Sequence, residues 1–225
     1  MASESKNGHR QRVRKKIKKS GLIGMAEYEI LEYMLFSLFP VKDTKDVAKK
    51  LLKKFKTLEN LLQAPKKRVL EVDGVGEAVY IHLKFTKELT EYLYKKGMED
   101  RDILNSVEKV YKYLRSDIGF LEKEVFKVIF LNSKNEYLGD EDLFRGTIDK
   151  SQIYAREIIK EAIKYNAKSV IFAHNHPSGS FKPSKADIDM TKKLKNILEP
   201  LEVRVLDHII ITSKGYYSFL EEGII

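Results

Sequence analysis

Residues 168–187, "KSVIFAHNHPSGSFKPSKAD", combine an apolar segment, two histidines and a turn. The segment "KSVIFAHNH" is rich in β-branched and aromatic residues before the first histidine, which is typical of a buried strand. Side chains two positions apart on a strand point to the same side, so the imidazoles of His174 and His176 should project together. Pro177 cannot donate a hydrogen bond to a neighbouring strand and is expected to end this one.

The chain is then expected to reverse direction and bring a carboxylate back to the histidines. Ser178-Gly179-Ser180 is a turn sequence, and a helix is predicted from Ser184 to Leu198 with Asp187 in its first turn. Two imidazoles and one carboxylate could then meet at one point. Three such ligands with a fourth position open are typical of catalytic zinc, so Zn²⁺ is the expected cofactor.

Three simpler explanations remain open when only the spacing is considered. Ser184 and Asp187 match the spacing of a capping box and could serve only to cap the helix. Paired histidines beside a turn could simply be solvated. The string "HNH" resembles a nuclease motif, although strings this short match by chance. Because the chain has no cysteine, any metal site must use His, Asp and Glu.

Length and composition indicate a globular protein. The 225 residues, of which 43% are hydrophobic, are enough for one large domain or two small ones. No apolar run approaches the roughly 18–20 residues that a membrane span needs. The beginning, "MASESKNGHRQRVRKK", is polar and basic, unlike a secretory signal. We therefore expect a soluble, cytoplasmic protein without a membrane partner.

Positive charge is concentrated in the first part of the chain. Residues 1–100 hold 22 Lys and Arg against 14 Asp and Glu, a balance of +8, whereas residues 101–225 hold 20 against 19, a balance of +1. A basic half beside a neutral half favours a polyanion-binding module joined to a second domain. The alternative is that lysine-rich helices only keep the protein in solution.

The first half is predicted to be helical. Residues 1–20 form a basic arm that we expect to be partly ordered, and residues 21–98 show apolar residues at helical spacing with short connections. Gly97 is expected to end the last helix, and residues 99–104 read as a linker. If this half binds DNA, the expected contacts from the arm are Arg12, Arg14, Lys15 and Lys16.

A helix-hairpin-helix is the predicted structure of residues 72–84, "VDGVGEAVYIHLK". Backbone amides of Gly74, Val75 and Gly76 could approach a phosphate at the start of the second helix, where the helix dipole also favours an anion. Such contacts would be independent of base sequence. Glu77 is unfavourable beside a phosphate, and a tight turn that binds nothing is the alternative.

Residues 105–225 mix strands and helices. "EVFKVIFLN" alternates, with Phe126, Val128 and Phe130 on one face, which indicates a strand, and "EVRVLDHIIITS" is a second long strand. Asp207 and His208 are consecutive strand residues that point in opposite directions, so we expect His208 to lie in the core or beside the ligands. The expected fold class is α+β, with a helical domain followed by a mixed α/β sheet domain at residues 105–225.

The histidine and aspartate spacing matches a known metal signature. His-x-His, seven residues, Ser, two residues and Asp resembles the JAMM (MPN-type) motif at every defined position. The flanking "FRGTID", "REIIKEAI", "LDHIII" and "YYSF" resemble the bacterial RadC family. "GHRQRVRKKIKKSGL", "DVAKKLLKKF" and "VDGVGEA" resemble that family's helical domain, so the resemblance covers nearly the whole chain.

The resemblance implies a JAMM/MPN-type, cytidine-deaminase-like sheet domain with a zinc-dependent hydrolase activity, as a metallopeptidase or isopeptidase. His174, His176 and Asp187 would bind Zn²⁺, with a water as the fourth ligand. Ser184 would hydrogen-bond the oxyanion as negative charge develops. A glutamate from an earlier strand would orient and deprotonate the water, and Glu124 matches its position; Glu122 and Glu157 remain alternatives.

Other functions remain open. The chain could be a non-catalytic DNA-binding protein of recombination or repair, or a zinc-dependent nuclease. The expected partners are DNA, bound without sequence preference through the helical domain, and a protein or peptide substrate. An exposed strand edge could also permit a dimer.

Overall fold

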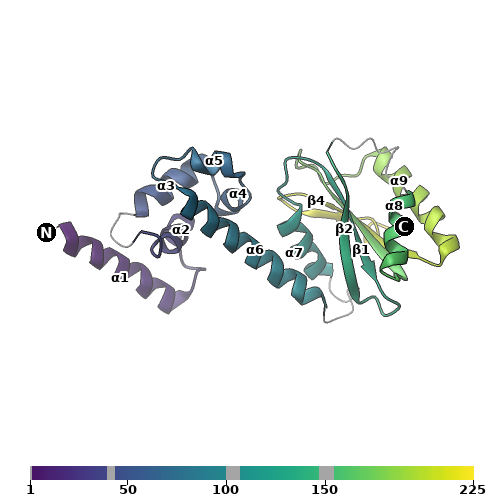
Figure 1. The fold of residues 1–225 in the computed structure, drawn as a ribbon, viewed down its shortest axis with the longest axis horizontal. Coiled ribbons are helices and arrows are strands. Elements are labelled where there is room, and N and C mark those ends of the chain that lie inside the picture. Colours follow the sequence, from purple (N-terminus) through teal and green to yellow (C-terminus); the bar gives the residue numbers. More distant parts are fainter. Residues whose placement is uncertain (1, 40–43, 100–106, 147–154) are drawn as a thin grey trace. The chain divides into compact units, whose positions relative to one another are not determined.

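The computed structural model describes residues 2–39, 44–99, 107–146 and 155–225. The chain divides into two compact units, Met1–Leu89 and Thr90–Ile225, and the division falls inside one long helix, α6 (Glu77–Glu99). The first unit is helical and the second contains the sheet (Figure 1). The predicted α+β class is therefore confirmed. Apart from Glu99, the predicted linker lies outside the described residues.

The helical unit has its own apolar core. Its other helices are α1 (Ala2–Ser20), α2 (Glu27–Leu35), α3 (Thr44–Phe55), α4 (Leu58–Leu62) and α5 (Lys66–Leu70). Helix α3 buries Val47, Leu51 and Phe55, which are four residues apart and therefore share one helix face. These side chains pack with Leu31, Leu35, Leu61, Val69, Val79 and Leu83.

The basic arm predicted at residues 1–20 is a helix. Helix α1 spans Ala2–Ser20, and Val13 is buried with Met25 and Phe36 in a small apolar cluster. Ile17, one turn further on, packs against the same cluster. This apolar contact holds the helix against its own unit, so the basic side chains of α1 project from a packed helix rather than from a loose arm.

The sequence predicted that the last helix of this half ends at Gly97. Helix α6 instead continues to Glu99. A glycine inside a helix costs about 0.5–1 kcal/mol relative to alanine. Met98, which follows it, is only 2% exposed and lies in a core cluster of the second unit. Burying a methionine contributes about 1.5–3 kcal/mol, which outweighs the cost of the glycine.

Among the residues that the structure describes, the second unit is a five-stranded sheet with helices. Strand order is β2-β1-β3-β4-β5; β3 and β4 are parallel and the other neighbours are antiparallel. Its elements are α7 (Val107–Asp117), β1 (Val125–Leu131), β2 (Tyr137–Arg145), α8 (Ala155–Lys164), β3 (Ser169–Asn175), α9 (Lys185–Leu198), the short 3₁₀ helix η2 (Glu199–Leu201), β4 (Arg204–Ile211) and β5 (Tyr216–Ser218).

Helices cover both faces of this sheet (Figure 1). Phe126, Val128 and Phe130 of β1 pack with residues of α8 and α9, as the predicted alternation requires. Val125 and Ile129, which point to the opposite face of β1, are buried too, because they pack with α7. A central strand covered on both sides presents no solvated face.

The parallel pairing of β3 and β4 positions the candidate site. Parallel neighbours need a crossover, and α9 supplies it by running back from the end of β3 toward the start of β4. The first turn of α9 therefore begins near the C-terminal end of β3. No helix within the described ranges is both long and apolar enough to cross a membrane.

Candidate metal centre

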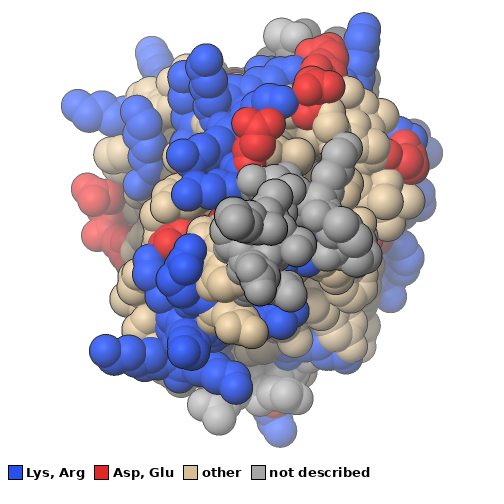
Figure 2. Space-filling view, turned by 90° about the vertical axis from the view of Figure 1, so that its left-hand side faces the viewer, with Lys and Arg blue, Asp and Glu red and all other residues tan. Residues whose placement is uncertain are grey.

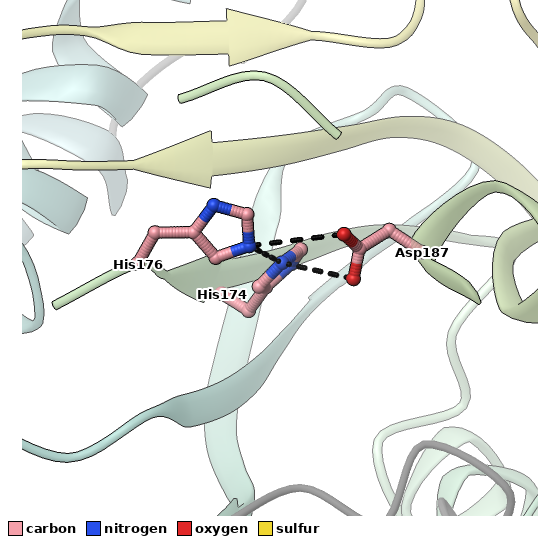
Figure 3. A group of neighbouring side chains, drawn as sticks. All are labelled: His174, His176 and Asp187. Atoms are coloured by element: carbon pink, nitrogen blue, oxygen red, sulfur yellow. Dashed lines mark hydrogen bonds and ion pairs between the residues drawn. The ribbon is translucent and has the colours of Figure 1, made fainter. Parts of the chain in front are cut away.

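The structure brings His174, His176 and Asp187 together at the end of β3 (Figure 3). The two histidine Nε2 atoms lie 2.9 Å apart. The Asp187 carboxylate has Oδ1 3.3 Å from His174 Nε2 and Oδ2 3.7 Å from His176 Nε2. His174 and Asp187 are buried, and the His176 side chain is 11% exposed. Within the described residues, this group could hold a metal ion.

The turn after β3 sets the orientation of His176. Its Nδ1 lies 2.7 Å from the carbonyl oxygen of Ser180. A carbonyl can only accept, so Nδ1 carries the proton and Nε2 keeps its lone pair. Gly179 has φ +80°, in the left-handed region that favours glycine, and its amide donates to the carbonyl of His176 over 3.0 Å. The predicted turn thus closes back on the histidine itself.

Strand β4 provides the contact that orients His174. His174 Nδ1 lies 2.8 Å from Nε2 of His208, which is fully buried. The predicted place of His208 beside the ligands is confirmed. Asp207 serves the other side of the strand, where it accepts hydrogen bonds from the Ser218 hydroxyl at 2.6 Å and the Leu220 amide at 2.9 Å. Burial raises the pKa of the Asp207 carboxyl despite these donors.

Ser184 and Asp187 form the capping box that the spacing predicted. Asp187 N donates to Ser184 Oγ at 3.2 Å, and Ser184 N donates to Asp187 Oδ2 at 2.7 Å. The Ser184 hydroxyl also donates to Asp187 Oδ2, at 2.6 Å. Capping and metal binding are therefore compatible, because the cap holds one carboxylate oxygen while the other faces His174. A hydroxyl has a single proton, so the oxyanion role predicted for Ser184 requires this hydroxyl to turn away from Asp187.

Glu124 lies immediately before β1 and is half-buried. Its carbonyl accepts a hydrogen bond of 2.9 Å from the amide of Gly146, which keeps it beside β2. Glu122, one of the alternatives, is exposed. Glu157, the other, is on α8, where its carboxylate lies 3.6 Å from Lys160 Nζ.

Asn175 anchors the segment that carries Glu124, a role that the sequence analysis missed. This residue between the two histidines accepts a 2.7 Å hydrogen bond from Val125 N and donates 3.1 Å bonds to the carbonyls of Leu121 and Lys123. It is 1% exposed and points away from the histidines, as the alternation of a strand requires. The signal in the sequence was one amide side chain between two histidines at the end of an apolar strand.

The donor set fits a divalent metal ion such as Zn²⁺. His176 presents an Nε2 lone pair toward His174 Nε2, and a carboxylate lies beside both nitrogens. Nitrogen and carboxylate donors that converge at this distance repel one another unless a cation compensates them. Imidazole nitrogen and carboxylate oxygen are ordinary zinc ligands. Three of them, from β3 and α9, could hold the ion.

The residues predicted to contact DNA lie on α1 and on the turn between α5 and α6. Arg12, Arg14 and Lys15 are exposed. Lys16 donates to Glu29 at 2.6 Å, and this hydrogen bond lowers the pKa of the Glu29 carboxyl. Figure 2 shows the side of the molecule that lies on the left in Figure 1, and there Lys and Arg side chains cover much more of the surface than Asp and Glu. The exposed basic residues also include Lys49, Lys50 and Lys53 of α3.

The turn before α6 contains one glycine that the backbone requires. Gly74 has φ +84°, and a Cβ there would lie 3.4 Å from Val47 Cγ2. The amide of Val75 donates to the carbonyl of Val72 within the turn, so a phosphate would have to be met mainly by the amides of Gly74 and Gly76. The assignment of this turn as a helix-hairpin-helix stays a prediction.

Comparison with known proteins identifies the family. A family model described as the RadC-like JAB domain matches residues 104–224, beginning one residue before the predicted start of the sheet domain. The chain belongs to this family. The UPF0758 protein FN0909 of Fusobacterium nucleatum subsp. nucleatum is 44% identical to it over the full length of both chains. The predicted resemblance to RadC proteins is confirmed, and the RadC-like domain here has a JAMM/MPN-type fold.

Proposed function

We propose that this RadC-family protein is a zinc-dependent hydrolase that cleaves an amide or isopeptide bond. The observation that carries the proposal is the convergence of His174, His176 and Asp187, with donor atoms all within 4.8 Å of one another. Three protein ligands leave a coordination position for a water or a substrate, which distinguishes catalytic zinc sites from structural ones.

The zinc ion and the protein side chains would have different roles in the hydrolysis. Zinc at this position would lower the pKa of a coordinated water to about 7 and polarise the substrate carbonyl. Glu124 would accept the proton released by that water and return it to the departing amine. Asp187 keeps its orientation through the capping box, and Ser184 would donate to the oxyanion when its hydroxyl turns toward the substrate.

Strand register favours Glu124 as the proton carrier. In the antiparallel pair of β1 and β3, Phe126 lies opposite His174 and Val128 opposite Phe172. Continued by two residues, the same register aligns Glu124 with His176 on the histidine-bearing face, since residues two apart on a strand share a face. The hydrogen bonds from Asn175 to the segment before β1 would keep this alignment rigid.

Replacing Glu124 with glutamine is the central test. The variant should lose hydrolysis by on the order of 10²-fold, because an amide cannot accept the proton, while its zinc content stays that of the wild type. The measurement is single-turnover cleavage of a mixed peptide library, read by mass spectrometry, on protein purified without chelators and loaded with one zinc. Glu157→Gln is the matched control and should cleave like the wild type.

The same proteins distinguish the competing functions. Wild type that cuts duplex or single-stranded DNA, with Glu124→Gln inactive, would replace the peptidase with a zinc nuclease. Wild type that binds DNA and zinc but cleaves neither substrate would favour a non-catalytic DNA-binding protein of recombination or repair. Wild type that retains no zinc after loading contradicts the hydrolase proposal.

We also propose that the helical unit binds DNA through phosphate contacts. The support is the excess of exposed Lys and Arg over acids on the face in Figure 2. Glu77, which disfavoured a phosphate contact in the sequence, is paired with Lys66 at 2.6 Å. Asp73 and Glu71 of the same turn are paired with Lys50 and Lys54 at 3.0 and 2.8 Å. The acids of the turn are therefore partly neutralised.

Salt dependence tests the DNA proposal. Each lost phosphate contact reduces the slope of log K against log salt concentration by about 0.9. Replacing Arg12, Arg14 and Lys15 with alanine should therefore flatten the slope by up to about 2.7 and weaken binding to duplexes of different sequence equally. Fluorescence anisotropy across a salt series measures both. A control that replaces Lys192, Lys193 and Lys195 of α9 makes the same charge change; an equal effect from it would contradict the assignment to α1.

A further inference from the structure

A buried row of hydrogen bonds links two of the three candidate ligands without passing through the metal position. Thr191, one helical turn after Asp187 on α9, donates its hydroxyl proton to the Asp187 carbonyl oxygen at 2.6 Å. The same hydroxyl oxygen lies 2.6 Å from His208 Nδ1. His208 Nε2 lies 2.8 Å from His174 Nδ1. Thr191 and His208 are fully buried, and His174 is 1% exposed.

The chemistry of the groups gives this row one direction. A carbonyl oxygen can only accept, so the single proton of Thr191 points to Asp187. Thr191 Oγ1 must then accept from His208, which places the His208 proton on Nδ1. In the neutral ring, Nε2 is then an acceptor and receives the Nδ1 proton of His174. His174 Nε2 is left with its lone pair, and this atom faces His176 and Asp187.

Aromatic rings isolate the middle of the row. The rings of Phe126, Phe172 and Phe219 lie 5.8, 6.0 and 4.7 Å from that of His208, centroid to centroid. Buried polar atoms in such apolar surroundings must find their partners within the protein. The hydrogen-bond order is therefore set by the protein and not by exchange with solvent.

We propose that Thr191 and His208 are positioning residues that select the metal-binding tautomer of His174 before the ion arrives. The backbone carbonyl of one ligand, Asp187, orders the protons of a relay that ends on the ring of another ligand, His174. The site is thereby prepared for a cation in its metal-free form. The inference rests on the proposed metal site but not on hydrolysis.

Thr191→Val removes the acceptor with little change of shape. Valine offers no lone pair where Thr191 Oγ1 lies, so His208 gains by moving its proton to Nε2, where His174 Nδ1 can accept it. His174 would then carry its own proton on Nε2, the nitrogen that the metal needs. Losses of partners that orient metal ligands typically lower metal affinity by 10–100-fold, and we expect a decrease in this range. Thr191→Ser keeps the hydroxyl and should behave like the wild type.

Imidazole ¹⁵N spectra of the zinc-free protein test the proton order directly. At about pH 8, above the ordinary histidine pKa of about 6.5, wild type should show His174 and His208 protonated on Nδ1. Thr191→Val should show both protonated on Nε2. A wild-type His208 protonated on Nε2 overturns the proposal, and these spectra decide it even if the protein proves inactive or binds no zinc.

Zinc titration against a chromophoric chelator provides the second measurement. Thr212→Val is the matched control, because Thr212 is also fully buried and its hydroxyl accepts hydrogen bonds from the amides of Lys214 and Gly215. It should lower stability without lowering zinc affinity. Equal zinc affinities for wild type and Thr191→Val, or an equal loss in Thr212→Val, would contradict the relay. If Thr191→Val does not fold, the wild-type and Thr191→Ser spectra still decide the proton order.

Discussion

We expect zinc affinity to fall by about 10³-fold when His174 is replaced by alanine. Zinc sites in proteins bind with apparent free energies of about 10–16 kcal/mol, so the loss of one of three protein ligands should remove roughly 4 kcal/mol. His174 is a buried candidate ligand, and its Nε2 lies within 3.3 Å of both other ligand residues. The proposed hydrolysis should be lost together with the metal.

Competition with a chromophoric chelator and metal analysis of the purified protein measure this effect. His82→Ala is the control, because His82 lies on α6 and is not one of the three ligand residues. It should keep one zinc per chain. A His174→Ala protein that binds zinc as tightly as the wild type would show that the three side chains do not hold the ion.

Replacing Lys127 with methionine should lower the free energy of unfolding by about 3–5 kcal/mol, the range for breaking a buried ion pair from one side. Lys127 lies within β1 and is only 4% exposed, although its side chain is charged. Its Nζ is 3.0 Å from Asp117, 2.8 Å from Asp140 and 2.7 Å from Asp142. Asp140 is also bonded by the hydroxyls of Tyr113 and Tyr137. Methionine would leave this group of carboxylates without its central cation.

The destabilisation should depend on pH. Burial by itself would raise the pKa of the Asp140 carboxyl, but the charge of Lys127 and the surrounding donors hold it below its ordinary value of 3.8. A carboxyl whose pKa is lower in the folded protein contributes stability above about pH 4 and loses it as pH falls through the folded-state pKa. The difference between wild type and Lys127→Met should therefore be largest near pH 7 and shrink in acid.

Urea unfolding at several pH values, followed by circular dichroism, gives both results. Lys134→Met is the control, since Lys134 lies in the exposed turn between β1 and β2. Its effect should stay within about 0.5 kcal/mol, as expected for a surface position. A Lys127→Met protein as stable as the wild type near pH 7, or a difference that grows below pH 4, would contradict this account of the cluster.

Local patterns in the sequence were sufficient for most secondary structure and for the candidate ligands. The apolar run before His174, the alternation around Phe126 and the box formed by Ser184 and Asp187 depend on neighbouring residues, whose geometry a strand or a helix repeats. The same locality explains the error at Gly97. Glycine weakens a helix locally, but helix α6 continues past Gly97 because Met98 is buried in the core of the sheet unit.

Long-range pairing decided what surrounds the ligands. Lys127 alternates with Phe126 and Val128 in the sequence, and only the fold shows that α7 and β2 bring three aspartates to it. Thr191 gave only a faint signal, its helical spacing from Asp187, and Asn175 gave only its position between the two histidines. Their partners come from β4 and from the segment before β1.

The sequence by itself determined that two histidines and an aspartate share a short stretch with metal-ligand spacing, because the strand, turn and helix between them are local structures. Only the tertiary structure decided in what order the buried side chains around the ligands contact one another, and so which groups hold the ligands in place. That order depends on hydrogen bonds between residues 17 to 54 positions apart, and no periodic pattern along the chain encodes such contacts.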